Sequence, residues 1–161
     1  MGSMSFSSAS PEDTRALGEA LGRVLQDGDF VGLEGELGAG KTEFARGLAK
    51  GAGVPEDEVA SPTFAIVHAY RGRLPLAHAD LYRLTDSDDL YGTGYHELRD
   101  GPGAMAVEWL DRFPDAAPAD ALRIRFTETG DGLRELHCQT SGTLSRHLLE
   151  RWRDELLCRV G

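Results

Sequence analysis

Apolar positions along the chain alternate between helical and strand spacing, and this alternation predicts an α/β fold. A helix is predicted from Ser10 to Gly28, because an N-cap serine, a proline and two acids precede apolar residues at helical spacing. Phe30 to Leu33 is a short apolar run of the kind found in buried strands. A second helix is predicted from Lys41 to Gly51, where helical spacing returns and glycines follow as stop signals.

Strand spacing dominates the middle of the chain. Thr63 to Tyr70 alternates, and a short connection leads to Leu74 to Ala79, so these two segments are predicted to form a β-hairpin. Residues 86–103 are interrupted by glycines and contain two short helical stretches at most. Ala104 to Val107 is a further candidate for a buried strand.

The last third of the chain predicts a surface loop, a second hairpin and a long helix. The loop runs from Asp111 to Asp120 and is rich in Pro, Ala and Asp. Leu122 to Phe126 and Leu133 to Cys138 are predicted strands joined by a Gly-Asp-Gly turn. The closing helix has an apolar stripe made of Leu144, Leu148, Leu149, Trp152 and Leu156.

These elements predict a single-domain α/β fold with a mixed parallel and antiparallel sheet flanked by helices. The domain is expected to cover residues 10–161, and residues 1–9 are expected to be a disordered tail whose Met-Gly-Ser start is typical of a cloning scar. No apolar run approaches the ~20 residues of a membrane span, and no secretion signal is recognisable. We therefore expect a cytoplasmic protein, with Cys138 and Cys158 as buried, reduced thiols.

Candidate chemistry begins at Gly35 to Thr42, which spells a complete G-x-x-x-x-G-K-[ST] phosphate loop, or P-loop (Walker A). Its glycines allow successive N–H groups to point into one concavity that holds phosphate oxygens. Lys41 would reach the β- and γ-phosphates, and the Thr42 hydroxyl would ligate Mg²⁺. The chain has 15 Arg but only two Lys, one of which is Lys41. The alternative is a glycine-rich turn without ligand, but the order strand, loop, helix favours the nucleotide site.

The formal net charge of −10 argues against a protein that binds nucleic acid by itself, because such proteins need a basic surface. The arginines near the C-terminus are interleaved with acids and indicate an ordinary solvated helix face. If the function involves RNA, we expect a partner to supply most of the contact.

Two acids are candidates to complete a nucleotide site. Asp80 and Glu108 each follow an apolar strand, and a P-loop protein needs such an acid to hold the metal or to orient the attacking water. The alternative is an exposed acid that ends a strand. Sequence patterns leave open which of the two lies closer to the metal.

Other polar and aromatic residues carry weaker signals. Ser-Pro-Thr at 61–63 places the Thr63 hydroxyl where a switch segment senses a γ-phosphate, although this tripeptide is common in turns. Trp109 follows Glu108 directly, and its ordinary role is core packing. His68 and His78 lack metal-ligand spacing and are interpreted as structural.

Four segments together resemble one family, the small bacterial ATPases of tRNA threonylcarbamoyladenosine biosynthesis called TsaE (formerly YjeE). The P-loop alone is shared by many NTPases. The combination of a His-x-Asp-Leu-Tyr-Arg-Leu segment with a later Val-Glu-Trp is much more specific to this family. The resemblance runs from about Ser10 to the last helix and departs from the family pattern after Trp109. The matching segments are Gly-Glu-Leu-Gly-Ala-Gly-Lys-Thr at 35–42, Ser-Pro-Thr-Phe at 61–64, His-Ala-Asp-Leu-Tyr-Arg-Leu at 78–84 and Val-Glu-Trp at 107–109.

The resemblance implies a P-loop NTPase fold that binds ATP or ADP with Mg²⁺ and hydrolyses ATP slowly. It implies that Thr42 and Glu108 ligate Mg²⁺, and that Lys41, Asp80 and Glu108 form the catalytic set, with Asp80 needed for hydrolysis. It also implies that residues 12–14 approach the adenine. The nucleotide contacts that it implies are Leu37, Gly38, Ala39, Gly40, Lys41, Thr42, Thr63 and Trp109.

The resemblance further implies an accessory role and two partners. ATP turnover would support the enzyme that attaches a threonylcarbamoyl group to adenosine 37 of tRNA, and the partners would be the transferase subunit and its paralogous scaffold subunit. tRNA would be held mainly by these partners, as the acidic composition also indicates. Two other functions stay open: a small-molecule kinase, and a nucleotide-gated interaction module with negligible turnover.

Overall fold

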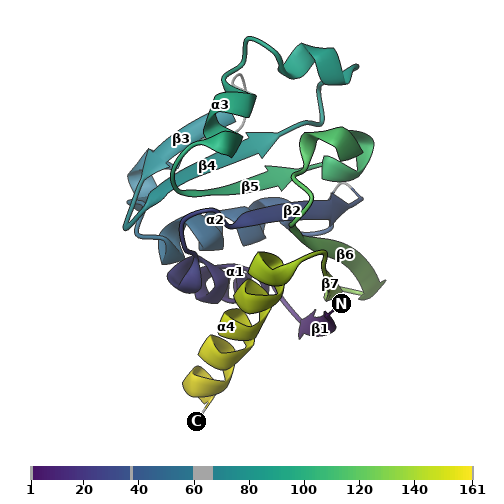
Figure 1. The fold of residues 1–161 in the computed structure, drawn as a ribbon. Helices are drawn as coiled ribbons and strands as arrows, with labels where there is room; N and C mark the ends of the chain where they lie inside the picture. The colour runs from purple at the N-terminus through teal and green to yellow at the C-terminus, as the bar shows by residue number, and fades with distance from the viewer. Residues whose placement is uncertain (1, 37, 60–66, 161) are drawn as a thin grey trace.

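A seven-stranded sheet runs through the part of the chain that the structure describes, residues 2–36, 38–59 and 67–160 of a computed structural model (Figure 1). The strands lie in the order β1-β7-β6-β2-β5-β4-β3. β2 is parallel to β5 and β6, and β4 is parallel to β5, whereas the β3–β4, β6–β7 and β1–β7 pairs are antiparallel. The strands are β1 (Ser3–Ser8), β2 (Phe30–Gly35), β3 (Val67–Arg71), β4 (Pro75–Asp80), β5 (Ala104–Glu108), β6 (Leu122–Gly130) and β7 (Leu133–Thr140).

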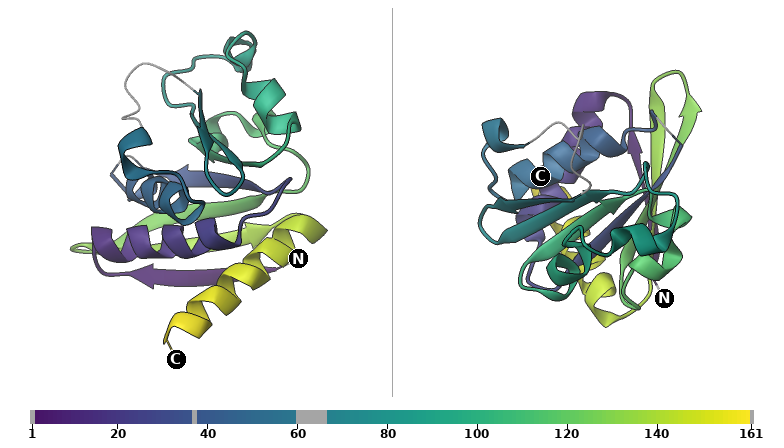
Figure 2. Two further views of the ribbon diagram at one scale, coloured as in Figure 1. Left: turned by 90° about the vertical axis from the view of Figure 1, so that its left-hand side faces the viewer. Right: turned by 90° about the horizontal axis from the view of Figure 1, so that it is seen from above.

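Helices cover both faces of this sheet, and the right-hand view of Figure 2 shows α1 and α2 on one side and α3 on the other. The predicted mixed α/β fold is therefore confirmed. The helices are α1 (Pro11–Val24), α2 (Lys41–Gly51), α3 (Tyr95–Asp100) and α4 (Thr143–Val160), with single 3₁₀ turns at η1 (Glu56–Glu58), η2 (Ser87–Leu90), η3 (Leu110–Arg112) and η4 (Pro114–Ala116).

The strands supply two cores because successive side chains point to opposite faces. Val31 and Leu33 pack with α1, α2 and α4 in the larger core, while Phe30 of the same strand packs in the smaller core with α3 and the turns after β5. All five residues of β5 are buried, as expected for a central parallel strand. The sheet therefore holds the ends of β2, β4 and β5 rigidly in place.

Helices α1 and α2 pack backbone against backbone through glycines. A methyl group added to Gly22 would lie 2.1 Å from the Leu48 carbonyl oxygen, and one added to Gly47 would lie 2.0 Å from that of Arg15. Such distances admit no side chain. This close packing fixes the position of α2, and with it the loop that precedes α2.

The expectation of a disordered N-terminal tail is wrong for residues 3–8. These residues form β1, which pairs antiparallel with β7, and the Phe6 ring lies 4.5 Å from that of Trp152. Met4 and Phe6 alternate with serines at strand period, but their partners on β7 lie 130 or more residues away along the chain. The local pattern therefore identified no partner.

Three smaller expectations also need correction. Cys158 is exposed, whereas Cys138 is buried as predicted. Leu144, assigned to the apolar stripe of the last helix, is 52% exposed, whereas Leu148, Leu149 and Trp152 of that stripe are buried in the larger core. The predicted surface loop from Asp111 to Asp120 contains η4 and buries Phe113 and Ala116 in the smaller core.

Candidate functional site

The P-loop lies at the edge where the parallel strands end. β2 finishes at Gly35, α2 begins at Lys41, and Gly38 and Gly40 adopt φ values of 82° and 105° between them. These left-handed conformations favour glycine, which lacks the Cβ atom that strains other residues there. The arrowheads of β2, β4 and β5 in Figure 1 point toward the same edge. The backbone curl that the glycines predict is therefore present, at the N-terminus of a helix.

Asp80 and Glu108 lie side by side at this edge. They are register partners at the ends of the parallel strands β4 and β5, and Glu108 is also the register partner of Leu33 in β2. Carboxyl ends of parallel strands with a helix start beside them are a common place for a ligand site. A pocket of about 240 Å³ opens here, lined by Gly38, Gly40, Lys41, Thr42, Glu43, Asp80, Tyr82, Glu108 and Trp109.

Lys41 is folded back onto the loop from which it comes. Its ammonium group donates hydrogen bonds to the carbonyl oxygens of Gly35 and Glu36, the latter at 2.9 Å, and lies 3.7 Å from the centre of the Trp109 ring. Only 4% of the residue is exposed, and this burial lowers the pKa of Lys41, an effect that nearby carboxylates, chiefly Glu108, oppose. Its partners are thus neutral carbonyls and a ring, which phosphate oxygens can replace.

Trp109 adopts φ of 66°, the one positive value at a non-glycine position among the described residues. Its backbone N–H donates to the Leu33 carbonyl oxygen at 3.0 Å, and its ring lies 5.0 Å from that of Tyr82. Strained backbone of this kind is often found at functional sites. The structure places Trp109 between the smaller core and the pocket, so packing and pocket lining are both satisfied by one residue.

Glu108 is 2% exposed and hydrogen-bonded to a histidine. Nε2 of His78 lies 2.7 Å from Oε2 of Glu108. Sequence reasoning took His78 for a structural residue and missed this contact. The signal was present, since His78 and Asp80 are two residues apart on one strand and must share a face of the sheet.

Asp80 is held by its own turn. The Tyr82 N–H donates to Oδ1 of Asp80 at 3.0 Å. Burial raises the pKa of Asp80 above its ordinary value, and the negative charge of Glu108 acts in the same direction. A carboxyl group with this perturbation beside a pocket is typical of residues that handle protons or metal ions.

The donor set fits Mg²⁺ only together with another ligand. Over the described ranges, no group of three or more His, Cys, Asp and Glu side chains is placed to hold a metal ion. Thr42 and Glu108, the two predicted Mg²⁺ ligands, line the same pocket. In nucleotide sites, Mg²⁺ usually binds few protein groups, such as one carboxylate and one hydroxyl, and takes its other ligands from phosphate and water oxygens.

Residues 12–14, expected near the adenine, lie at the start of α1 close to the loop. Thr14 donates to or accepts from the Ser8 hydroxyl at 2.7 Å, and its methyl group lies 3.4 Å from where a Cβ on Gly40 would be. The start of α1 therefore borders the P-loop. Leu37 and Thr63, two other predicted nucleotide contacts, lie outside the described residues.

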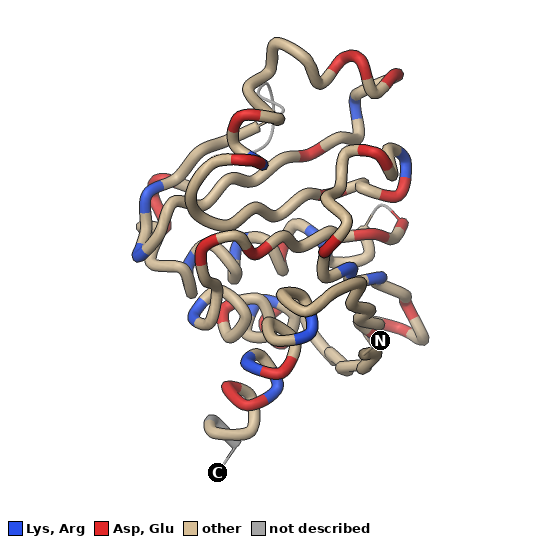
Figure 3. Tube along the Cα trace, viewed as in Figure 1, with Lys and Arg blue, Asp and Glu red and all other residues tan. Residues whose placement is uncertain are grey.

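The arginines near the C-terminus are interleaved with acidic residues, as the sequence indicates. Basic and acidic positions alternate along α4 in Figure 3. On the face of the sheet opposite α2, Glu34 is 6% exposed and binds Arg123 at 2.8 Å and Arg125 at 3.1 Å. Both arginines are thus engaged in ion pairs with Glu34.

Comparison with known proteins decides the family. The family model described as "Threonylcarbamoyl adenosine biosynthesis protein TsaE" matches residues 8–136. The chain belongs to the TsaE family. The resemblance inferred from the four sequence segments is thereby confirmed, and threonylcarbamoyladenosine biosynthesis is the process in which a TsaE-family chain takes part.

Curated relatives and a solved structure agree with this membership. The chain is 41% identical over 129 residues to the tRNA threonylcarbamoyladenosine biosynthesis protein TsaE of Treponema pallidum, covering 80% of this chain and 95% of the relative. It is 38% identical to the protein of that name from Bacillus subtilis, covering 93% and 94%. The crystal structure of YdiB from Bacillus subtilis superposes with a TM-score of 0.77 at 30% identity and covers 95% of each chain.

Within the described ranges, the helices are all too short or too polar to cross a membrane.

Proposed function

We propose that this TsaE-family chain binds Mg·ATP in the pocket at the end of β2 and hydrolyses it slowly in support of threonylcarbamoyl transfer to adenosine 37 of tRNA. One observation carries the proposal: Lys41, Asp80 and Glu108, which are distant in sequence, line a single pocket at the start of α2. Membership of the TsaE family supports the role in tRNA modification, and the P-loop sequence supports a nucleotide as the ligand.

The residues of the pocket divide the task among them. The loop N–H groups from Gly38 to Thr42 bind phosphate oxygens, and Lys41 exchanges its carbonyl partners for the β- and γ-phosphates. Thr42 and Glu108 hold Mg²⁺, which when bound neutralises charge on the phosphate oxygens. Asp80 orients the attacking water and accepts its proton, a role favoured by its raised pKa.

The proposed partners are the transferase subunit and its paralogous scaffold subunit, in the cytoplasm. These subunits hold most of the tRNA, because the net charge of −10 opposes direct binding of a polyanion. A pull-down with both subunits, with and without ATP, tests this part. Association that ATP does not change, together with normal modified-adenosine levels in a depleted strain, would count against it.

Hydrolysis is tested by three substitutions. Lys41→Ala is expected to abolish nucleotide binding or turnover, whereas Asp80→Ala and Glu108→Ala retain much of the binding and lose at least about 100-fold in phosphate release. Full hydrolysis by Asp80→Ala would remove the role given to Asp80. Counting phosphate released to water against phosphate transferred to metabolites separates this function from a small-molecule kinase.

A further inference from the structure

The contact between His78 and Glu108 joins two strands on one face of the sheet. In the parallel β4–β5 pair, His78 is the register partner of Ala106 and Asp80 is that of Glu108. His78 and Glu108 are therefore diagonal neighbours, a separation that a long side chain can bridge. The bridge is short, at 2.7 Å, and its side chains are 14% and 2% exposed.

Glu108 depends on this bridge for its orientation. The part of the chain that the structure describes gives its carboxylate one hydrogen-bond partner, His78. Lys41, the nearest cation in the pocket, donates its hydrogen bonds to loop carbonyls. A carboxylate that binds a metal ion is ionised and can only accept, so in that state the contact requires the form of His78 that carries a proton on Nε2.

We propose that His78 is a positioning residue: its Nε2–H holds one oxygen of Glu108 so that the other is free to serve, with Thr42, as a ligand for Mg²⁺. This inference rests on the proposed function, in which Glu108 is a metal ligand. Carboxylates that bind metals are themselves usually hydrogen-bonded, and loss of such a partner typically costs about 10- to 100-fold in metal affinity or activity.

A packing role for His78 makes a different prediction. His78 also borders a small apolar space beneath α2, next to Ala45 and Leu48. If filling that space were its task, leucine would replace it well, since leucine has a similar volume and no N–H group. Glutamine has the opposite character, because its amide places a donor at a reach similar to that of Nε2.

His68 is a matched control. It is the register partner of His78 on β3, and its ring stacks on Tyr70 with a centroid distance of 6.0 Å. Within the described residues, its Nε2 atom is buried without a hydrogen-bond partner. His68→Leu therefore makes the same chemical change one strand further from Glu108.

The experiment measures ATP binding by calorimetry in EDTA and over a Mg²⁺ titration. We expect His78→Leu to raise the Mg²⁺ concentration needed for half of the metal-dependent gain in affinity about tenfold. We expect its affinity in EDTA to stay within about twofold of that of the unsubstituted protein, because the loop contacts to phosphate are intact. His78→Gln should recover most of the Mg²⁺ response, and His68→Leu should match the unsubstituted protein.

Several outcomes would overturn the inference. An unchanged Mg²⁺ requirement in His78→Leu, or equal losses with and without Mg²⁺, would reduce His78 to a structural residue. So would a loss in His78→Gln as large as that in His78→Leu, with both variants folded by circular dichroism.

Glu108→Gln separates this inference from the proposed function. If Glu108→Gln itself leaves the Mg²⁺ requirement unchanged, Glu108 does not hold the metal and both proposals lose that assignment. If Glu108→Gln raises the requirement and His78→Leu does not, only the positioning role fails.

Discussion

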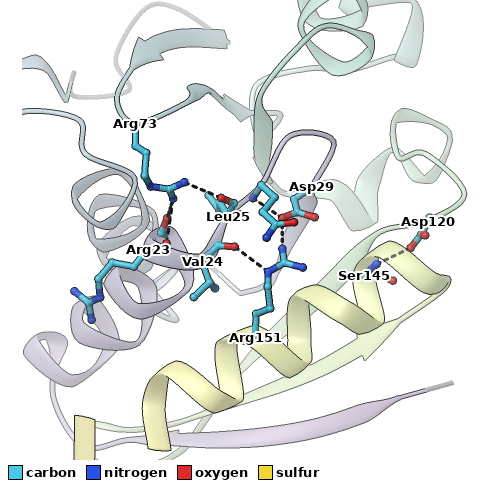
Figure 4. A network of polar contacts seen from close by, with 10 residues as sticks. Arg23, Val24, Leu25, Asp29, Arg73, Asp120, Ser145 and Arg151 are labelled. Atoms are coloured by element: carbon cyan, nitrogen blue, oxygen red, sulfur yellow. Dashed lines mark hydrogen bonds and ion pairs between the residues drawn. The ribbon is translucent and has the colours of Figure 1, made fainter. Parts of the chain in front are cut away.

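The two ends of the parallel strands use charge in opposite ways. At the amino end, where β2 begins, Asp29 accepts a hydrogen bond from the Gln26 N–H at 2.7 Å and pairs with Arg151 of α4, also at 2.7 Å (Figure 4). Arg151 in turn donates to the Val24 carbonyl oxygen at 3.1 Å. Asp29 and Arg151 are therefore direct partners of opposite charge.

Arg73 makes further contacts at the amino end of the strands. It lies in the turn between β3 and β4 and donates to the carbonyl oxygens of Gly22 and Leu25 at 2.8 and 3.0 Å (Figure 4). The last carbonyl groups of a helix lack partners within it and carry partial negative charge. Arg73 therefore closes α1 and ties it to the hairpin.

The carboxyl end leaves its charges poorly compensated. Lys41 is buried against neutral carbonyls, and Asp80 lies beside another acid. Burial raises the pKa of both Asp29 and Asp80, but only Asp29 has an arginine as a hydrogen-bonded partner among the described residues. Buried charges that lack a hydrogen-bonded partner of opposite charge weaken a fold but remain available to a ligand. The comparison favours a stabilising role for the amino end and agrees with the proposed nucleotide site at the carboxyl end.

The largest effect on stability is expected at the amino end. Asp29→Ala should lower the free energy of unfolding by about 2 to 3 kcal/mol, because it leaves Arg151 and the Gln26 N–H without their acceptor. Urea denaturation measures this loss, and Asp57→Ala, at an exposed acid in η1, serves as control. A loss below about 0.5 kcal/mol would show that Asp29 does not anchor this end.

Arg73→Met should have the next largest effect, a loss of about 1 to 2 kcal/mol. Methionine keeps much of the apolar side chain but cannot donate to the last carbonyls of α1. Arg71→Met, an exposed arginine on the same hairpin, should change stability by less than about 0.5 kcal/mol. Equal losses of stability in the two variants would mean that the loss comes from removing a positive charge and not from the hydrogen bonds of Arg73 to α1.

Lys41→Met should leave stability unchanged or raise it by up to about 1 kcal/mol, while nucleotide binding is lost. Removing a buried ammonium group offsets the loss of its hydrogen bonds to Gly35 and Glu36. Thermal unfolding and ATP titration of the same preparation check both parts. A stability loss above about 1 kcal/mol would make Lys41 a structural residue and erase the contrast between the ends.

The smallest effect concerns the pH dependence of stability. Burial raises the pKa of Asp80 above its ordinary value of 3.8 in the folded protein, so the folded state binds more protons than the unfolded chain as the pH rises past that value. The contribution of Asp80 to stability should therefore fall over this window, from pH 3.8 up to the raised pKa. Asp80→Asn cannot titrate and should lack this fall.

The test for Asp80→Asn is urea denaturation of both proteins between about pH 3.5 and 7. The stability advantage of the variant should grow with pH across the window and stay constant above it. An advantage that shrinks as the pH rises would mean that the folded-state pKa of Asp80 is lowered instead.

Local patterns predicted much of this protein because helices, turns and strand ends depend on neighbouring residues. The helix beginning at Lys41 and the strand leading to Glu108 are present as expected. β1 was missed because its partner strand comes from the far end of the chain. The contact between His78 and Glu108 was missed because it crosses between strands: spacing along one strand shows that His78 and Asp80 share a face, but not which residue of the next strand lies beside them.

The sequence by itself determined the P-loop composition, the order of strand, loop and helix, and the acids at two strand ends, since all of these follow from local spacing. Tertiary structure alone decided that Asp80 lies next to Glu108, that Lys41 packs under Trp109, and that His78 holds Glu108. The physical reason is that these contacts depend on strand order and register. Both are set when the whole sheet and its two cores form together.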